Sequence, residues 1–275
     1  MRRIGFLASP YQQQSRSCRE ERVTILNMID NRSTWGKRSI ALFAPIALIA
    51  AGIVSIVSPV SAQESTPATT TPIGVVETDA TEINCSTDPA TPSPLTTSVT
   101  TTYVIGPDGS EARYRVQEEL VNKGAIEAVG STTAIQGGIY LDEAGIPLAC
   151  SRFDVDLRTL TSDESRRDNA LHSQTLETAT YPLATFVLSS IEGIDSALVE
   201  GEDTTVVLVG NLTMHDVTRV VAWEATVTLN GDVITGKAAT EFEMPEFNIT
   251  PPKMGPVLSI DETVVLEIDF TANKA

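Results

Sequence analysis

Apolar and polar residues alternate with a period of two along much of residues 101–275, which is the pattern of half-buried β-strands. In Arg219–Leu229, for example, Val221 and Trp223 share one apolar face, and Glu224 lies on the opposite face. The pattern recurs in seven further segments: Glu111–Leu120, Thr133–Leu141, Ser151–Leu160, Ala184–Ile191, Thr204–Met214, Val233–Met244 and a closing strand at Val264–Phe270. Residues 101–275 are therefore predicted to form an all-β domain of about eight strands.

Two local signals refine this prediction. Asn230-Gly231 follows an alternating segment directly, and this dipeptide favours a tight β-hairpin in which both turn residues have positive φ. Thr161-Ser162-Asp163-Glu164 has the spacing of a helix capping box, which predicts a short helix reaching to about Leu176. Tyr181-Pro182 then ends any helical course.

Eight consecutive antiparallel strands can remove their unpaired edges by closing into a barrel. The fold class predicted is therefore all-β, an eight-stranded antiparallel barrel with one short helix in a long connection. A barrel of this size is filled by side chains or holds one small ligand. Alternation places these side chains on inward faces, some as core and some as ligand contacts: Tyr114, Val116, Phe153, Val155, Phe186, Leu188, Val221, Trp223, Phe242 and Phe270.

Residues 1–62 have the pattern of an export segment. Lys37-Arg38 precede the apolar run Ile40–Val57, and Val60-x-Ala62 is a small-residue cleavage site before Gln63. The run is close to the length that spans a bilayer, so an uncleaved membrane anchor is the alternative. Met28 is an alternative start that would give an ordinary signal length. Either outcome predicts an extracytoplasmic body that is secreted, periplasmic or tethered to a membrane.

Residues 63–100 are rich in Thr, Pro and Ser and are predicted to be an extended linker to the domain at 101–275, because they offer little apolar surface to bury. Cys85 lies in this linker, and Cys150 lies in the domain. Loss of the export segment would leave these two cysteines in an oxidising compartment, where disulfides persist. A Cys85–Cys150 disulfide is predicted, with two free thiols as the alternative.

Charge and composition exclude several functions. Residues 1–62 carry 8 Lys and Arg against 3 Asp and Glu, whereas residues 63–275 carry 11 against 33, a net charge of −22. Such an acidic body repels phosphate backbones, so nucleic acid is not an expected partner. The chain has three cysteines and two histidines, His172 and His215, and no CxxC, HExxH or GxSxG motif. No metal site, cofactor or catalytic residue is predicted.

Four blocks of residues, in this order, resemble signature segments of the YceI-like family. They are Gly130–Thr132 with Gln136–Leu141, Arg167-Asp168 with Leu171 and Tyr181–Phe186, Gly210–Arg219, and Glu246–Ile249. The resemblance implies an eight-stranded, lipocalin-like barrel that is secreted or periplasmic and binds a polyisoprenoid or similar amphipathic lipid in its interior. It implies no catalysis.

The chain departs from the family pattern at several positions. Ala170 stands where members often have His, and Leu176-Glu177 replace a usual aromatic pair. Met244 stands where an Arg is common, and Asn248 replaces a glycine. The resemblance therefore indicates the mode of binding more firmly than the identity of the ligand.

The candidate ligand-binding residues form a set of inward side chains and one charged pair: Tyr114, Phe153, Val155, Arg167, Asp168, Phe186, Leu188, Val221, Trp223, Phe242 and Phe270. Arg167 and Asp168 could recognise a charged head group at the barrel mouth. The favoured alternative is a structural ion pair or helix cap. Two other functions stay open for the chain: a packed barrel that binds a partner through its acidic surface, and, with least support, a lipid-modifying enzyme.

Overall fold

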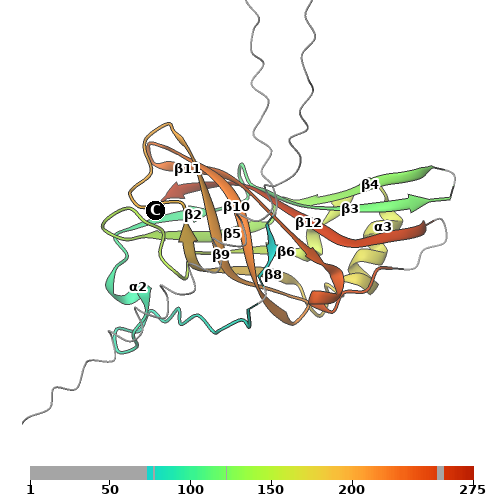
Figure 1. The fold of residues 1–275 in the computed structure, drawn as a ribbon, viewed down its shortest axis with the longest axis horizontal. Helices are drawn as coiled ribbons and strands as arrows, with labels where there is room; N and C mark the ends of the chain where they lie inside the picture. Colours follow the sequence, from blue (N-terminus) through green and yellow to red (C-terminus); the bar gives the residue numbers. More distant parts are fainter. Residues whose placement is uncertain (1–72, 77, 122, 253–256) are drawn as a thin grey trace, which may run out of the picture. The chain divides into compact units, whose positions relative to one another are not determined.

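The alternating segments are strands in the computed structural model of the chain, which describes residues 73–76, 78–121, 123–252 and 257–275 (Figure 1). The predicted export segment 1–62 and residues 63–72 of the predicted linker lie outside the described residues. Eight strands form a closed antiparallel ring in this order: β2 (Thr101–Ile105), β5 (Ile135–Leu141), β6 (Arg152–Asp156), β8 (Leu183–Glu192), β9 (Asp203–Met214), β10 (Val217–Asn230), β11 (Val233–Glu243) and β12 (Val257–Lys274). Pairing of β12 with β2 closes the ring, which confirms the predicted barrel.

Three further strands extend the sheet at one end: β3 (Glu111–Leu120), β4 (Gly124–Thr132) and β7 (Thr161–Ser162). The 18-residue β12 pairs with β2 at its C-terminal end and with β3 over the rest of its length. Strands β2 and β3 thus follow one edge of β12 in succession, and β4 pairs with β3. In Figure 1 this extension lies at the same end as helix α3 (Ser165–Ala170).

The predicted helix is present, but it begins later than predicted. Helix α3 runs directly into the π-helical turn η3 (Leu171–Thr175), giving 11 helical residues. Thr161-Ser162 form strand β7 instead of a cap, so the predicted capping box is wrong. The N-cap is Glu164, whose side chain accepts a hydrogen bond from the Arg166 backbone N–H at 3.1 Å. Pairing of β7 with β4 takes precedence over the local capping signal.

The predicted hairpin joins β10 to β11, but its turn lies one residue further on. Asn230 pairs with Val233, so the two turn residues are Gly231 and Asp232, and of these only Gly231 has a positive φ, at 60°. The prediction that Asn230 itself occupies the turn is therefore wrong. A turn with two positive φ values joins β9 to β10 instead, at His215 (50°) and Asp216 (59°).

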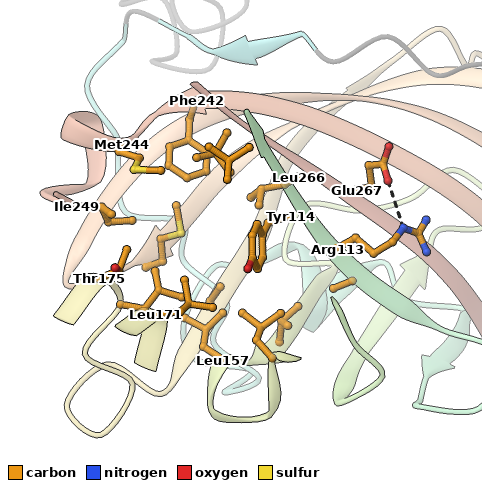
Figure 2. A pocket seen from close by; sticks show the side chains of 18 of the residues that line it. Arg113, Tyr114, Leu157, Leu171, Thr175, Phe242, Met244, Ile249, Leu266 and Glu267 are labelled. Atoms are coloured by element: carbon orange, nitrogen blue, oxygen red, sulfur yellow. Dashed lines mark hydrogen bonds and ion pairs between the residues drawn. The ribbon is translucent and has the colours of Figure 1, made fainter. Parts of the chain in front are cut away.

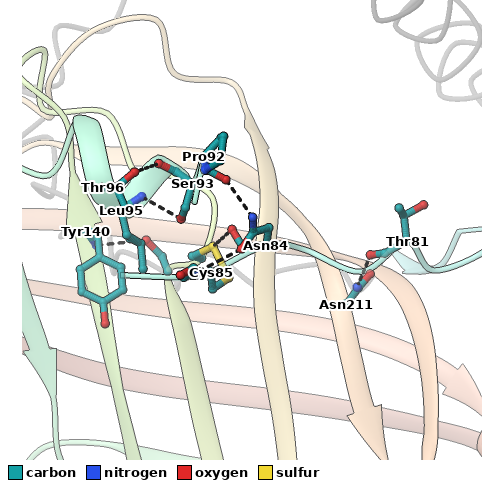
Figure 3. Close-up of a disulfide and its surroundings, with 12 residues drawn as sticks. Thr81, Asn84, Cys85, Pro92, Ser93, Leu95, Thr96, Tyr140 and Asn211 are labelled. Carbon is teal, nitrogen blue, oxygen red and sulfur yellow. Dashed lines mark hydrogen bonds between the residues drawn. A yellow bond between two sulfur atoms is a disulfide. The ribbon is translucent and has the colours of Figure 1, made fainter. Parts of the chain in front are cut away.

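Residues 73–76 and 78–100, in the predicted linker, are attached to the barrel at several points (Figure 3). Strand β1 (Gly74–Val75) pairs with β10, and Asn211 Nδ2 donates to the Thr81 carbonyl at 2.8 Å. Cys85 and Cys150 are joined by a disulfide with a Cα–Cα distance of 5.5 Å. Between the disulfide and β2 lies the short helix α2 (Pro94–Thr97), capped by Ser93.

Two 3₁₀ turns complete the described structure: η2 (Leu157–Thr159) after β6, and η4 (Met244–Phe247) after β11. Their buried residues, Leu157, Met244 and Phe247, join the core cluster inside the barrel. Within the described residues, no helix has the length and apolar character needed to cross a membrane.

Candidate ligand-binding site

Two apolar cavities lie inside the barrel. Cavity A has a volume of about 120 Å³ and is bounded by β3, β12, the helix α3–η3 and η4 (Figure 2). Cavity B has a volume of about 90 Å³ and is bounded by strands of the ring and by the loops after β5 and β8. A well-studied engineered cavity of about 150 Å³ holds benzene, so each cavity can hold a compact apolar group.

An aromatic cluster separates the two cavities. The ring of Phe153 stacks on Phe186 at a centroid distance of 5.2 Å, and Trp223 meets both rings edge-on at 5.7 and 5.9 Å. Trp223 lines cavity A, Phe186 lines cavity B, and Phe153 lines both. A rotation of Phe153 would therefore change the wall that both cavities share.

The structure divides the predicted site residues into three groups. Cavity A is lined by Tyr114, Phe153, Val155, Arg167, Trp223 and Phe242. Cavity B is lined by Phe153, Phe186, Leu188 and Phe270. Val221 and Asp168 line neither cavity: Val221 is fully buried in the packed core, and Asp168 is occupied by hydrogen bonds to β7.

Glycines on neighbouring strands make room for two of the inward aromatic rings. Gly130 on β4 pairs directly with Tyr114 on β3, and a Cβ at Gly130 would lie 2.8 Å from Tyr114 Oη. A Cβ at Gly210 on β9 would lie 2.7 Å from Cζ of Phe186. Because neither glycine carries a side chain, each ring can lie flat against the neighbouring strand.

The helix α3–η3 is held over cavity A by a buried ion pair. Arg167 donates from Nε and Nη2 to the two carboxylate oxygens of Glu118 on β3, both at 3.2 Å, and from Nη1 to Asp163 at 2.5 Å. Arg167 is 8% exposed and Glu118 is 5% exposed. Burial disfavours the charged guanidinium, but hydrogen bonds and charges from Glu118 and Asp163 outweigh this and raise the Arg167 pKa.

Asp168 fixes the start of the same helix. Its Oδ1 accepts hydrogen bonds from the Ser162 backbone N–H at 2.8 Å and from the Ser162 hydroxyl at 2.7 Å. These contacts tie β7 to α3. Arg167 thus pairs with Glu118 and Asp163, Asp168 bonds to Ser162, and of the two adjacent residues only Arg167 borders cavity A.

Sequence reasoning missed the helix and the 3₁₀ turn as walls of cavity A. Leu171 and Thr175 from η3, and Met244 and Ile249 from the η4 region, face the other labelled side chains in Figure 2. Leu171 and Thr175 have the i, i+4 spacing of one helical face, which was an available signal. Two departures from the family pattern, Leu176 and Met244, also line this cavity.

The histidines are engaged in hydrogen bonds with the protein. His172 Nε2 lies 2.9 Å from the Leu160 carbonyl, and His215 Nδ1 lies 3.2 Å from the Phe247 carbonyl. Across the described ranges, no group of three or more His, Cys, Asp or Glu side chains has the geometry to hold a metal ion.

Comparisons with known proteins agree with this architecture. A family model described as the YceI-like domain matches residues 103–272. A solved polyisoprenoid binding domain from Saccharophagus degradans, implicated in plant cell wall breakdown, is 17% identical with a TM-score of 0.52, and the match covers 63% of this chain and 98% of that one. BcnA from Burkholderia cenocepacia is 18% identical with a TM-score of 0.48, covering 62% and 99%. No curated protein matches the chain. The first likeness shows a shared fold.

Proposed function

Since the chain belongs to the family of YceI-like domains, we propose that its barrel binds an amphipathic lipid with an isoprenoid or similar apolar tail in cavities A and B. The observation that carries this proposal is a pair of apolar cavities inside one barrel, separated by an aromatic cluster. The similar domain from Saccharophagus degradans is described as polyisoprenoid binding, which supports the same ligand class.

The energetics of burial support tight binding without catalysis. Each CH₂ group moved from water into an apolar site contributes roughly 0.8 kcal/mol before the entropy of association is subtracted. In the present side-chain arrangement, each cavity can hold a compact apolar group. A longer tail would need Phe153 to rotate so that the cavities join.

The proposed role is binding, storage or transport of the lipid outside the cytoplasm. The export pattern of residues 1–62 and the disulfide of the described domain support this location, because disulfides persist in oxidising compartments. A packed barrel serving only as an interaction module is the second candidate, and the two internal cavities weigh against it.

A matched pair of variants on β8 tests whether the barrel interior holds lipid. Ala184 borders cavity A, whereas its neighbour Leu183 is 42% exposed on the outer face. We expect Ala184→Phe to fill part of cavity A and to remove most of the lipid that copurifies with the protein, while Leu183→Phe leaves the lipid content unchanged. Organic extraction followed by mass spectrometry measures the lipid in each protein.

Circular dichroism verifies that both variants fold. A wild-type protein that carries no extractable lipid and takes up none would contradict the proposal, as would a folded Ala184→Phe protein with its full complement of lipid.

A further inference from the structure

Cavity A contains polar groups that have no hydrogen-bond partner in the described part of the protein. They are Tyr114 Oη on β3, Thr175 Oγ1 on η3 and Trp223 Nε1 on β10. Thr175 is 4% exposed and Trp223 is 1% exposed, and the Tyr114 hydroxyl is itself buried. Figure 2 shows Tyr114 standing in the middle of the pocket and Thr175 at its helical wall.

All three groups can donate a hydrogen bond, and the indole N–H of Trp223 can only donate. A buried donor without a partner has lost its hydrogen bonds to water with nothing in exchange, which costs free energy. A ligand atom that accepts a hydrogen bond from one of these groups would recover that cost. An entirely hydrocarbon ligand would leave all three donors unpaired.

The charges that line cavity A are already paired with one another. Arg167 is bound by Glu118, and Arg113 Nε donates to Glu267 at 3.1 Å; all four residues border the cavity. Arg113 also contacts Glu111 and Asp269. A phosphate or carboxylate entering this cavity would therefore meet cations whose charge is already neutralised, and two nearby carboxylates would repel it.

Tyr114 stays a protonated donor over a wide pH range. Burial is the largest influence and raises its pKa to about 12, with Arg167 opposing and nearby carboxylates adding to the shift. The absence of a side chain at Gly130 leaves room for the ring to lie against β4. Its hydroxyl is thus both positioned and available at neutral pH.

We infer that cavity A takes an uncharged oxygen acceptor on the lipid, such as a ketone, ester or amide carbonyl, through Tyr114 with Thr175 and Trp223 nearby, and that it discriminates against phosphate. This inference rests on the proposed lipid-binding function and specifies the polar end of the ligand.

Three probes with the same geranyl chain test the inference: geranylacetone with a carbonyl, geranyl phosphate with an anion, and 2,6-dimethylundeca-2,6-diene, the hydrocarbon in which CH₂ replaces the carbonyl of geranylacetone. Trp223 is the only tryptophan after residue 62, so its fluorescence reports on occupancy of cavity A in the exported protein. We expect geranylacetone to bind more tightly than the hydrocarbon, and geranyl phosphate to bind most weakly. Tyr114→Phe should weaken the binding of geranylacetone about tenfold and leave the affinity for the hydrocarbon unchanged.

The infrared carbonyl band of bound geranylacetone supplies a second measurement. Compared with geranylacetone in a hydrocarbon solvent, the band should lie at lower frequency in the wild-type protein, because the Tyr114 hydroxyl donates a hydrogen bond to the carbonyl. Tyr114→Phe should remove this shift. Tyr140→Phe, on β5 and bordering neither cavity, is the matched control.

The outcomes separate the two proposals. Equal affinities of the ketone and the hydrocarbon, with no effect of Tyr114→Phe, would overturn the inference while leaving lipid binding intact. Tighter binding of geranyl phosphate would overturn it as well. Failure of all three probes to bind, in a folded wild-type protein, would count against the proposed function itself.

Discussion

Gly130 controls where the ring of Tyr114 lies, and this makes it a residue-scale test of the site. Gly130→Ala places a methyl group against the ring and pushes it towards cavity A. We expect a stability loss of about 1–3 kcal/mol and reduced lipid uptake, measured by urea unfolding and by extraction.

Gly106 supplies the control for this substitution. A Cβ at Gly106 would meet no atom within 4 Å, and its φ is not in the left-handed region. Gly106→Ala should change stability by less than about 1 kcal/mol and leave lipid uptake unchanged. Equal behaviour of the two alanine variants would show that Gly130 has no steric role.

At the same scale, alternation predicted which side chains face inward but not which of them border empty space. Val221 and Trp223 lie two residues apart on one face of β10, yet only Trp223 borders a cavity. The difference depends on neighbouring strands, since Val221 pairs with Gly210 of β9 on one side and with Val75 of β1 on the other. One strand considered alone does not contain that information.

At the scale of elements, the long alternating strands could be predicted from the sequence, but strands β2 and β4 could not. Strands β2 and β4 were missed because Thr101-Thr102 continue a Thr-rich tract and Gly124–Thr132 contains mostly small residues, which gives weak alternation. The buried position of Glu118, in contrast, could be predicted from the sequence. Glu118 shares a face with Tyr114 and Val116, which predicts a buried carboxylate that needs a cationic partner.

The Arg167–Glu118 pair that joins α3 to β3 gives an element-scale prediction. Arg167→Met leaves the Glu118 carboxylate buried without its partner, and we expect a loss of about 3–5 kcal/mol in urea unfolding. The double variant Arg167→Met/Glu118→Leu removes both charges and should recover most of that loss.

A surface ion pair serves as the control for these two variants. Arg158 pairs with Asp156 on the barrel exterior, where the Arg158 side chain is 60% exposed. Arg158→Met should unfold at the same urea concentration as the wild-type protein. If the double variant were as unstable as Arg167→Met alone, the loss would come from packing and not from the unpaired charge.

At the scale of the whole described molecule, residues 73–76 and 78–100 belong with the barrel, through β1, the Asn211–Thr81 hydrogen bond and the Cys85–Cys150 disulfide. Composition alone predicted an extended linker here, because the segment has little apolar surface of its own to bury. Composition carries no information on the backbone and side-chain groups of the barrel to which the segment bonds. From the sequence, only the cysteine pair predicted that this segment is attached to the barrel.

The disulfide gives a prediction for the described molecule as a whole. It joins residues 65 apart in the sequence, and in the chain-entropy model such a link stabilises the folded state by roughly 4 kcal/mol. For a domain of this size, Cys85→Ser/Cys150→Ser should lower Tm by roughly 10 °C. Serine is the suitable replacement because Cys150 has a φ of 75°, and glycine there would also relax the backbone.

Thiol titration of exported protein that begins at Gln63, unfolded without reductant, should find no free thiol, since Cys18 would be lost with residues 1–62. Reduction of the wild-type protein should lower its Tm to that of the double variant, and the Tm of the double variant should not respond to reductant.

The disulfide holds the segment 78–100 against the barrel beside β5 and β6, so its loss should also raise the rate at which protease cleaves that segment. Two free thiols in the unreduced protein would contradict the predicted bridge, and an unchanged Tm in the double variant would show that the bridge adds nothing to stability.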